Sequence, residues 1–201
     1  MITQRLAALP LAALLAVTLA ACGSDESPAA DTPAPTGAAD EAGSAVALND
    51  ADIEFAQGMI AHHEQAIEMA EIALDPSRSA SPEVSDLATR IQSAQEPEID
   101  QMTTLLTDGG ASITMDMSEG HDMSSMDGMM TVEQMDALAV ATGTEFDRMW
   151  LDMMIDHHEG AITQSETVQA NGSNADALAL AETIITTQQA EITEMETLLE
   201  G

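Results

Sequence analysis

Basic residues are scarce in this sequence. Four Arg and no Lys stand against 36 acidic residues, which gives a formal net charge of −32. Nucleic-acid binding through phosphate contacts requires a basic surface, so this class of function is excluded. Docking on anionic lipid through basic charge is excluded for the same reason. The acidic surface attracts cations, although most of it is expected to be a solvated face that confers solubility.

Cysteine and aromatic residues are also nearly absent. The only cysteine is Cys22, and this excludes an intramolecular disulfide framework, a cysteine-based zinc finger and a cysteine-held iron–sulfur cluster. There are two Phe, one Trp and no Tyr, whereas Met occurs 15 times among 201 residues. The core of one ordinary domain must therefore be built from Ala, Leu, Ile and Met.

The first residues have the form of an export signal. Arg5 is followed by an apolar stretch, 6–19, that is too short to span a bilayer comfortably. The sequence Leu-Ala-Ala-Cys that ends at Cys22 resembles a lipobox, which implies that residues 1–21 are a lipoprotein signal peptide and that the Cys22 thiol carries lipid. An ordinary signal peptide or an uncleaved anchor is the alternative. Residues 22–48, rich in Ala, Pro, Ser and acids, are expected to form a disordered tether.

From Asn49 to Gly201 the chain repeats itself. The motif Met-Ile-Ala-His-His-Glu-Gln-Ala-Ile begins at Met59, and Met-Ile-Asp-His-His-Glu-Gly-Ala-Ile begins 95 residues later at Met154. A second motif, Leu-Ala-x-x-Ile-x-x-x-Gln-x-x-Glu-Ile-x-x-Met, begins at Leu87 and again 93 residues later at Leu180. Two motifs that recur in the same order indicate a duplicated unit of two elements.

The repeated unit is predicted to be a helical hairpin. Apolar residues recur at intervals of three and four, and no segment alternates as a strand does. Short loops within each unit make antiparallel hairpins, so the fold class is all-α, a four-helix bundle with pseudo-twofold symmetry. Pro97 is expected to kink the second helix. The helical domain covers 49–201, with repeat 1 at 50–108, a Met-rich loop at 109–131 and repeat 2 at 144–200; helices are expected near 50–75, 82–107, 132–141, 144–169 and 174–200.

The repeated histidines are candidate metal ligands. On a helical wheel His63 and His158 lie at the centre of the apolar stripe, and His62 and His157 lie at its edge. Imidazole and thioether form a soft donor set that suits Cu(I) or Ag(I). Hydrogen-bonded core histidines with Met as core filler are the alternative. The predicted ligands are Met59, His62, His63, Met102, Met154, His157, His158 and Met195, with Gln95, Glu98, Gln188 and Glu191 beside them, where a carboxylate orients an imidazole.

The segment between the repeats is a second candidate site. Six Met and one His occur within 16 residues, among Ser, Gly and acids. An unstructured acidic linker is the alternative, but exposed Met is prone to oxidation, so a soft-metal-binding loop is the favoured hypothesis. This loop would collect Cu(I), and the histidines would retain it. Its predicted ligands are Met115, Met117, His121, Met123, Met126, Met129 and Met130.

Both doubled motifs together resemble the family catalogued as domain of unknown function 305. The resemblance covers residues 50–200 and implies a ferritin-like helical bundle in an exported bacterial protein. Some members are implicated in copper binding and resistance outside the cytoplasm. Pro97 departs from the family pattern next to Glu98.

The sequence predicts an extracytoplasmic copper-binding lipoprotein for metal sequestration, chaperoning or resistance. Cu(I) is the favoured ion, with Cu(II) and Ag(I) as further candidates, and no catalytic residue is expected. Expected partners are the metal ion and the outer face of the cell membrane through lipidated Cys22; a copper-handling protein and a second copy of the chain are further candidates. Two alternatives stay open: a ferritin-like metal-dependent oxidase and a metal-free envelope interaction module.

Overall fold

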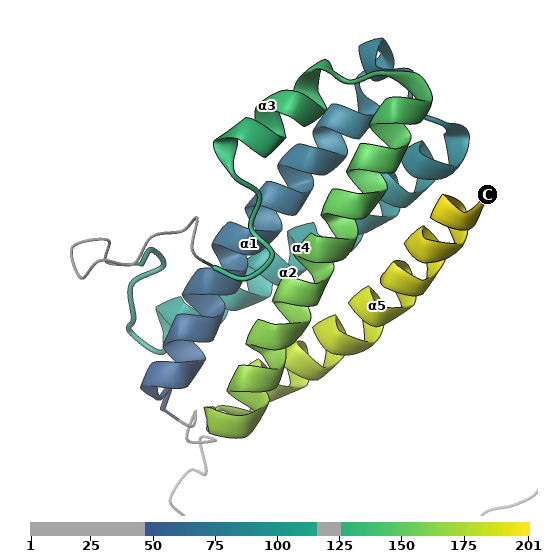
Figure 1. Ribbon diagram of the computed structural model, residues 1–201. Helices are drawn as coiled ribbons and strands as arrows, with labels where there is room; N and C mark the ends of the chain where they lie inside the picture. Colours follow the sequence, from purple (N-terminus) through teal and green to yellow (C-terminus); the bar gives the residue numbers. More distant parts are fainter. Residues whose placement is uncertain (1–46, 116–125) are drawn as a thin grey trace, which may run out of the picture. The chain divides into compact units, whose positions relative to one another are not determined.

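The computed structural model describes residues 47–115 and 126–201, all within one unit of the chain, Ala42–Gly201. These two ranges are helical and contain no strand (Figure 1). No helix in them is both long enough and apolar enough to cross a membrane. The expected signal peptide, Cys22 and nearly all of the tether lie outside the described residues. The elements are α1 (Asp50–Leu74), the 3-10 turn η1 (Pro76–Arg78), α2 (Pro82–Asp108), α3 (Val132–Val140), α4 (Gly143–Asn171) and α5 (Ala175–Glu200).

The helix starts follow from local sequence. At α1 the side chain of Asn49 accepts the backbone N–H of Asp52, and the Asp52 carboxylate accepts that of Asn49, both at 2.9 Å. Thr131 and Gln134 form the same reciprocal capping box at α3. Ser81 caps α2, with proline at the following position, where its missing N–H costs nothing.

Pro97 does not interrupt α2. The helix runs continuously from Pro82 to Asp108, although proline cannot donate the backbone bond that Ser93 would accept. Both Pro97 and Ser93 are exposed, so water can reach the carbonyl of Ser93. The break in hydrogen bonding thus falls on the solvent side, away from the buried face of the helix.

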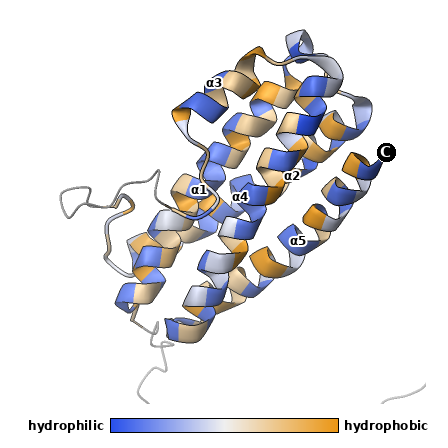
Figure 2. Ribbon diagram, viewed as in Figure 1, coloured by the Kyte–Doolittle hydropathy of each residue, from blue (hydrophilic) through white to orange (hydrophobic). Residues whose placement is uncertain are grey.

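The helices pack mainly as two hairpins that meet along one pair. α1 packs extensively on α2, and α4 packs on α5. α1 and α4 lie side by side and form the main contact between the two hairpins (Figure 1). α2 and α5 touch each other only slightly, and α3 contacts α1 and α4. Apolar residues recur along each long helix among hydrophilic ones (Figure 2), as expected for helices that bury one face.

A layer of polar side chains divides the core. One apolar cluster contains Trp150, whose indole N–H donates to the carbonyl of Met69 at 2.9 Å. The other cluster contains Phe55. Each long helix passes from one cluster to the other, and at its middle it contributes two buried polar residues. These are His62 and His63 on α1, Gln95 and Glu98 on α2, His157 and His158 on α4, and Gln188 and Glu191 on α5.

Two aspartates hold the hairpins together by their ends. Asp52 of α1 is fully buried and accepts hydrogen bonds from the backbone N–H groups of Ser173 and Asn174, at the start of α5. Asp147 of α4 accepts the backbone N–H of Ser81, at the start of α2, at 3.0 Å. These aspartates are 95 residues apart, the interval of the first motif, so matched positions in the repeats make matched contacts.

Candidate metal centre

Four of the five histidines lie at the middle of α1 and α4, and the fifth, His121, lies outside the described residues. The sequence places two of them at the edge of the apolar stripe, but the structure buries all four completely. The edge positions are buried because α1 and α4 face each other there. The four are His62, His63, His157 and His158.

Two of these histidines are held by carboxylates from the neighbouring helix of the same hairpin. Nε2 of His63 lies 2.7 Å from Oε2 of Glu98, and Nε2 of His158 lies 2.7 Å from Oε2 of Glu191. An ionised carboxylate only accepts hydrogen bonds, so it places the proton of a neutral imidazole on Nε2 and leaves the lone pair on Nδ1. Neither Nδ1 atom has a hydrogen-bond partner within 47–115 and 126–201.

The other two histidines face each other across the contact of α1 and α4. The ring centroids of His62 and His157 are 3.7 Å apart, with the planes inclined by 43°. Nε2 of His62 lies 3.3 Å from the carbonyl oxygen of Asp127, which can only accept, so the lone pair of His62 is on Nδ1. Among the residues that the structure describes, Nδ1 of His62 and both ring nitrogens of His157 have no hydrogen-bond partner.

Two glycines bring the chain near Asp127 onto this pair of rings. An ideal Cβ at Gly160 would lie 2.1 Å from the carbonyl oxygen of Asp127, and one at Gly128 would lie 2.7 Å from that of Asp156. Gly128 also has a φ of 81°, in the left-handed region that favours glycine. Gly160 lies one turn after His157 on α4, so the linker backbone touches α4 directly beside the histidine pair.

Two thioethers from the Met-rich segment approach the same place. The Cε atoms of Met115 and Met126 lie 3.2 and 3.3 Å from an ideal Cβ at Gly58. Gly58 precedes His62 by four residues and therefore lies on the same face of α1, one turn away. The two ends of the Met-rich segment thus meet beside the histidine pair. The sequence hypothesis treats the loop and the helices as separate sites, whereas the structure makes their ligands neighbours.

The other residues of the predicted site lie in different surroundings. Met59 and Met102 are fully buried together in the Phe55 cluster, and Met154 and Met195 in the Trp150 cluster, so each pair flanks the polar layer. Gln95 and Gln188 lie within the layer, and neither amide has a hydrogen-bond partner in the described part of the chain. The predicted loop ligands Met117, His121 and Met123 lie outside the described residues.

The end of the Met-rich segment is packed against the helices and is not exposed to solvent as a free loop would be. Met130 is buried in the Trp150 cluster, and its backbone N–H and carbonyl bond the side-chain amide of Gln65 at 2.7 and 3.0 Å. Met129 is half-buried. Met130 is therefore a core residue that anchors the linker just before α3.

Burial keeps the facing imidazoles neutral. Burial, with a smaller contribution from His63, lowers the pKa of His62 to about 3. Burial and then the neighbouring His62 lower the pKa of His157 well below its ordinary value. A neutral imidazole offers a nitrogen lone pair to a metal ion, so this pair is ready for coordination at neutral pH without losing a proton.

Thioether side chains lie near this histidine pair. Within 47–115 and 126–201, no group of three or more His, Cys, Asp or Glu side chains is placed to hold a metal ion. The Cε atoms of Met115 and Met126 lie beside Gly58, one helical turn before His62. Imidazole with thioether is a soft donor set, and it matches a soft monovalent ion such as Cu(I) or Ag(I).

Sequence reasoning did not single out the residues that position the linker. Gln65 and Gly160 occupy the same position in the two copies of the histidine motif, and they differ. Gln65 binds the backbone of Met130, and Gly160 admits the backbone of Asp127. A glycine inside a helix lowers the stability of the helix by about 1 kcal/mol relative to alanine. Gly58 and Gly160 were therefore signals in the sequence that another segment packs closely against the helix there.

Several known proteins are similar to this chain in fold and in sequence. The family model described as Domain of unknown function (DUF305) matches residues 52–199. A DUF305 fragment from Deinococcus radiodurans is 29% identical, with a TM-score of 0.68 over 77% of this chain and 98% of that chain. A DUF305 protein from Streptomyces coelicolor, described as secreted, is 27% identical, with a TM-score of 0.67 over 75% of this chain and 92% of that chain.

A third similar structure contains copper. CopM in its Cu(II)-bound form is 33% identical, with a TM-score of 0.61 over 74% of this chain and 95% of that chain. CopM has also been solved in Cu(I)-bound and Ag-bound forms. No curated protein sequence matches the chain significantly.

Proposed function

Because the chain belongs to the DUF305 family, we propose that it is an exported protein that binds copper as Cu(I) through imidazole and thioether ligands. Similarity to CopM, which has been solved with Cu(I), Cu(II) and Ag, supports copper as the ion and Ag(I) as its analogue. The finer fold proposal is a ferritin-like four-helix bundle whose two hairpins are related by pseudo-twofold symmetry.

One observation carries the proposal: the facing rings of His62 and His157 with two thioethers one turn away. Unpartnered buried polar groups cost about 1–3 kcal/mol each, and this layer contains several. A metal ion bound to Nδ1 of His62 and to a ring nitrogen of His157 would offset that cost. Met115 and Met126, whose Cε atoms lie beside Gly58, would supply sulfur ligands for the same ion.

The carboxylate-held histidines provide a second, internal pair of positions. Glu98 and Glu191 accept from the Nε2–H groups and so direct Nδ1 of His63 and His158 toward coordination. Met59 and Met102 on one side, and Met154 and Met195 on the other, supply thioethers at the borders of the polar layer. The two halves would thus hold equivalent ions.

The Met-rich segment has a role in delivery. Thioether ligands do not titrate and bind Cu(I) reversibly, so Met117, Met123 and Met129, with His121, would collect the ion. Met115 and Met126 would pass it to the histidine pair, because they belong both to the segment and to the surroundings of Gly58. Cargo binding rather than turnover is the proposed activity, since Glu98 and Glu191 are engaged by histidines. Lipidation at Cys22 would hold the protein at the membrane surface.

Anaerobic Cu(I) titration against a competing chelator tests this function. Replacing His62 and His157 together by Gln keeps polar side chains in the layer, and it should abolish the tightest site. The control His121→Gln removes the histidine of the Met-rich segment and should keep that site. Fluorescence of buried Trp150 reports whether each variant folds. A folded double variant that retains the tightest site contradicts the proposal.

A further inference from the structure

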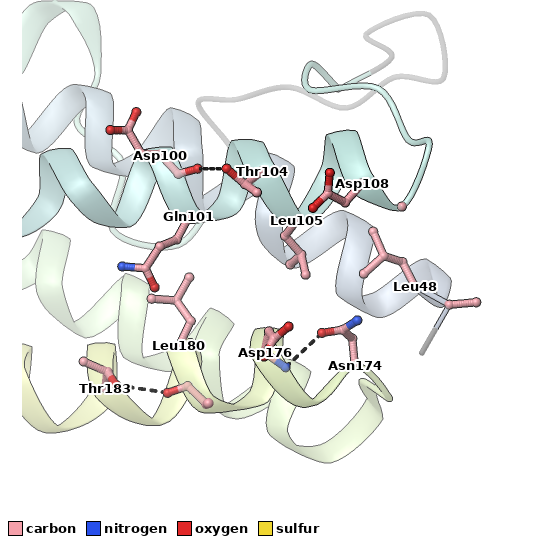
Figure 3. Close-up of a pocket in the computed structure, with 13 residues that line it drawn as sticks. Leu48, Asp100, Gln101, Thr104, Leu105, Asp108, Asn174, Asp176, Leu180 and Thr183 are labelled. Atoms are coloured by element: carbon pink, nitrogen blue, oxygen red, sulfur yellow. Dashed lines mark hydrogen bonds between the residues drawn. The ribbon is translucent and has the colours of Figure 1, made fainter. Parts of the chain in front are cut away.

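A groove of about 760 Å³ lies between α2 and α5, where these two helices barely touch (Figure 3). One face of each helix forms its walls, with residues at intervals of three and four. These are Gln101, Thr104, Leu105 and Asp108 on α2, and Asp176, Ala179, Leu180 and Thr183 on α5. The groove shares no residue with the candidate metal centre.

Sequence differences between the two repeats leave this groove open. Near the other end of the same two helices, Nη2 of Arg90 binds Oε1 of Glu194 at 2.5 Å and links α2 to α5. At an offset of 93 residues, the counterparts of Arg90 and Glu194 are Thr183 and Gln101, which line the groove. The ion pair is therefore missing where the groove lies.

Leucines form the apolar part of the groove. Leu105 of α2 and Leu180 of α5 extend into the space between the helices, and Leu48 closes one end (Figure 3). An ideal Cβ at Gly109 would lie 2.4 Å from Cδ1 of Leu48, so the glycine lets Leu48 lie against the end of α2. An occupant with apolar side chains would find a preformed surface here.

The polar part of the groove carries negative charge without a basic partner. Asp108 is the last residue of α2, Asp176 lies in the first turn of α5, and both are exposed. The C-terminal end of a helix has a partial negative charge, and α2 has no basic residue in its last turn. Asp108 adds to that charge instead of neutralising it. A cationic group is the complement of this end of the groove.

We infer that this groove docks a basic amphipathic segment of another protein, with apolar side chains against the leucines and Lys or Arg beside Asp108 and Asp176. This chain cannot supply that segment. It has no Lys and a net charge of −32, so a second copy is repelled. Residues 23–46 of its own sequence contain five acidic residues and no basic one. Charge complementarity therefore assigns the groove to a different, cationic partner.

The probe is a fluorescein-labelled, amidated peptide of about 14 residues, with Leu on one helical face and Lys on the other. Fluorescence anisotropy with the full chain, free of metal, should show saturable binding of one peptide per chain. A scrambled peptide of the same composition has the same charge but no apolar face, and it should bind about tenfold more weakly. Using metal-free protein keeps this test independent of the proposed copper site.

A charge-neutral variant provides the decisive comparison. Replacing Gln101→Glu and Thr183→Arg together reproduces the Arg90–Glu194 pair inside the groove and leaves the net charge unchanged. Closure should weaken peptide binding about tenfold, whereas general attraction to an acidic protein predicts no change. Asp108→Asn with Asp176→Asn should also weaken binding, and Glu64→Gln with Glu159→Gln, which removes two exposed acids elsewhere, should not.

Three results would overturn the inference. The first is equal binding of the amphipathic and scrambled peptides. The second is an equal loss of binding in the Asp108/Asp176 variant and in the Glu64/Glu159 control, which would mean that the peptide is attracted nonspecifically to acidic charge. The third is a dimer of the chain in sedimentation experiments that the Gln101/Thr183 variant abolishes, because the occupant would then be a second copy.

Discussion

The imidazole rings of His62 and His157 lie against each other across α1 and α4, with centroids 3.7 Å apart and planes inclined by 43°, and they occupy matching positions in two copies of one motif. Two buried rings at this distance cannot both carry a proton charge without strong repulsion. Burial lowers the pKa of both groups, and the neighbouring His62 lowers that of His157 further.

Acid should destabilise the metal-free protein through this pair. His62 has a pKa of about 3 when folded and about 6.5 when unfolded, so below pH 6.5 protons bind preferentially to the unfolded chain. Stability from His62 is complete above pH 6.5 and falls by about 2 kcal/mol at pH 5. Urea unfolding at pH 7 and pH 5 measures this. A variant with His62→Gln and His157→Gln should lack that part of the pH dependence. If stability falls equally with pH in the wild type and the variant, the histidine pair is not the cause.

Gly160→Ala should weaken metal binding without unfolding the helices. The added Cβ would collide with the carbonyl of Asp127 at 2.1 Å and displace the linker from the histidine pair, whereas alanine improves helix propensity by about 1 kcal/mol. Cu(I) affinity is expected to fall about tenfold, with helicity by circular dichroism preserved. Gly58→Ala meets only the ends of flexible side chains, Oε1 of Gln164 and Cε of Met115 and Met126, at 3.2–3.3 Å and should have a smaller effect. Equal effects of the two changes would disagree with this account.

Glu98→Ala and Glu191→Ala should cost similar amounts of stability. Each change leaves a buried imidazole N–H without its acceptor, because both carboxylates lie 2.7 Å from the histidine nitrogen. The expected loss is about 1–3 kcal/mol for each variant. Denaturant unfolding of the metal-free variants, followed by Trp150 fluorescence, gives both values. A loss confined to one variant would show that the halves are not energetically equivalent.

Asp52→Ala should destabilise the domain more than Asp147→Ala. Burial raises the pKa of Asp52, but backbone N–H groups of Asn49, Asn174 and Ser173 together outweigh burial and lower it. Removing the carboxylate leaves several donors unsatisfied, which costs about 2–3 kcal/mol, whereas Asp147 accepts one described hydrogen bond and should cost about 1 kcal/mol. Thermal unfolding ranks the two variants, and the reverse order would contradict the proposed role of Asp52.

Helix positions followed closely from periodicity and caps. The expected helix near 82–107 is observed as Pro82–Asp108, and the short helix near 132–141 as Val132–Val140. Ser81 and Thr131 are caps that a local sequence pattern reveals. Such features are encoded by neighbouring residues, and the all-helical prediction is confirmed within the described ranges.

Contacts across the chain could not be derived in the same way. The helical wheel placed His62 at the edge of the apolar stripe of α1. It could not show which helix packs against that edge, because the pairing of helices depends on the whole core. The approach of Met115 and Met126 to Gly58, and of Asp127 to Gly160, requires tertiary placement of the linker. The open groove depends on the Arg90–Glu194 ion pair between α2 and α5, which has no equivalent at the matching positions Thr183 and Gln101.

The most direct test of the central claim is X-ray absorption at the copper K-edge, on protein loaded anaerobically with one equivalent of Cu(I). The account predicts mixed nitrogen and sulfur coordination in the wild type. With Met115→Leu and Met126→Leu the sulfur contribution should fall and the nitrogen contribution remain. The control Met135→Leu with Met149→Leu, which alters two partly buried methionines packed against the Trp150 cluster, should match the wild type. Coordination by sulfur alone, or a spectrum unchanged by the Met115/Met126 variant, would contradict it.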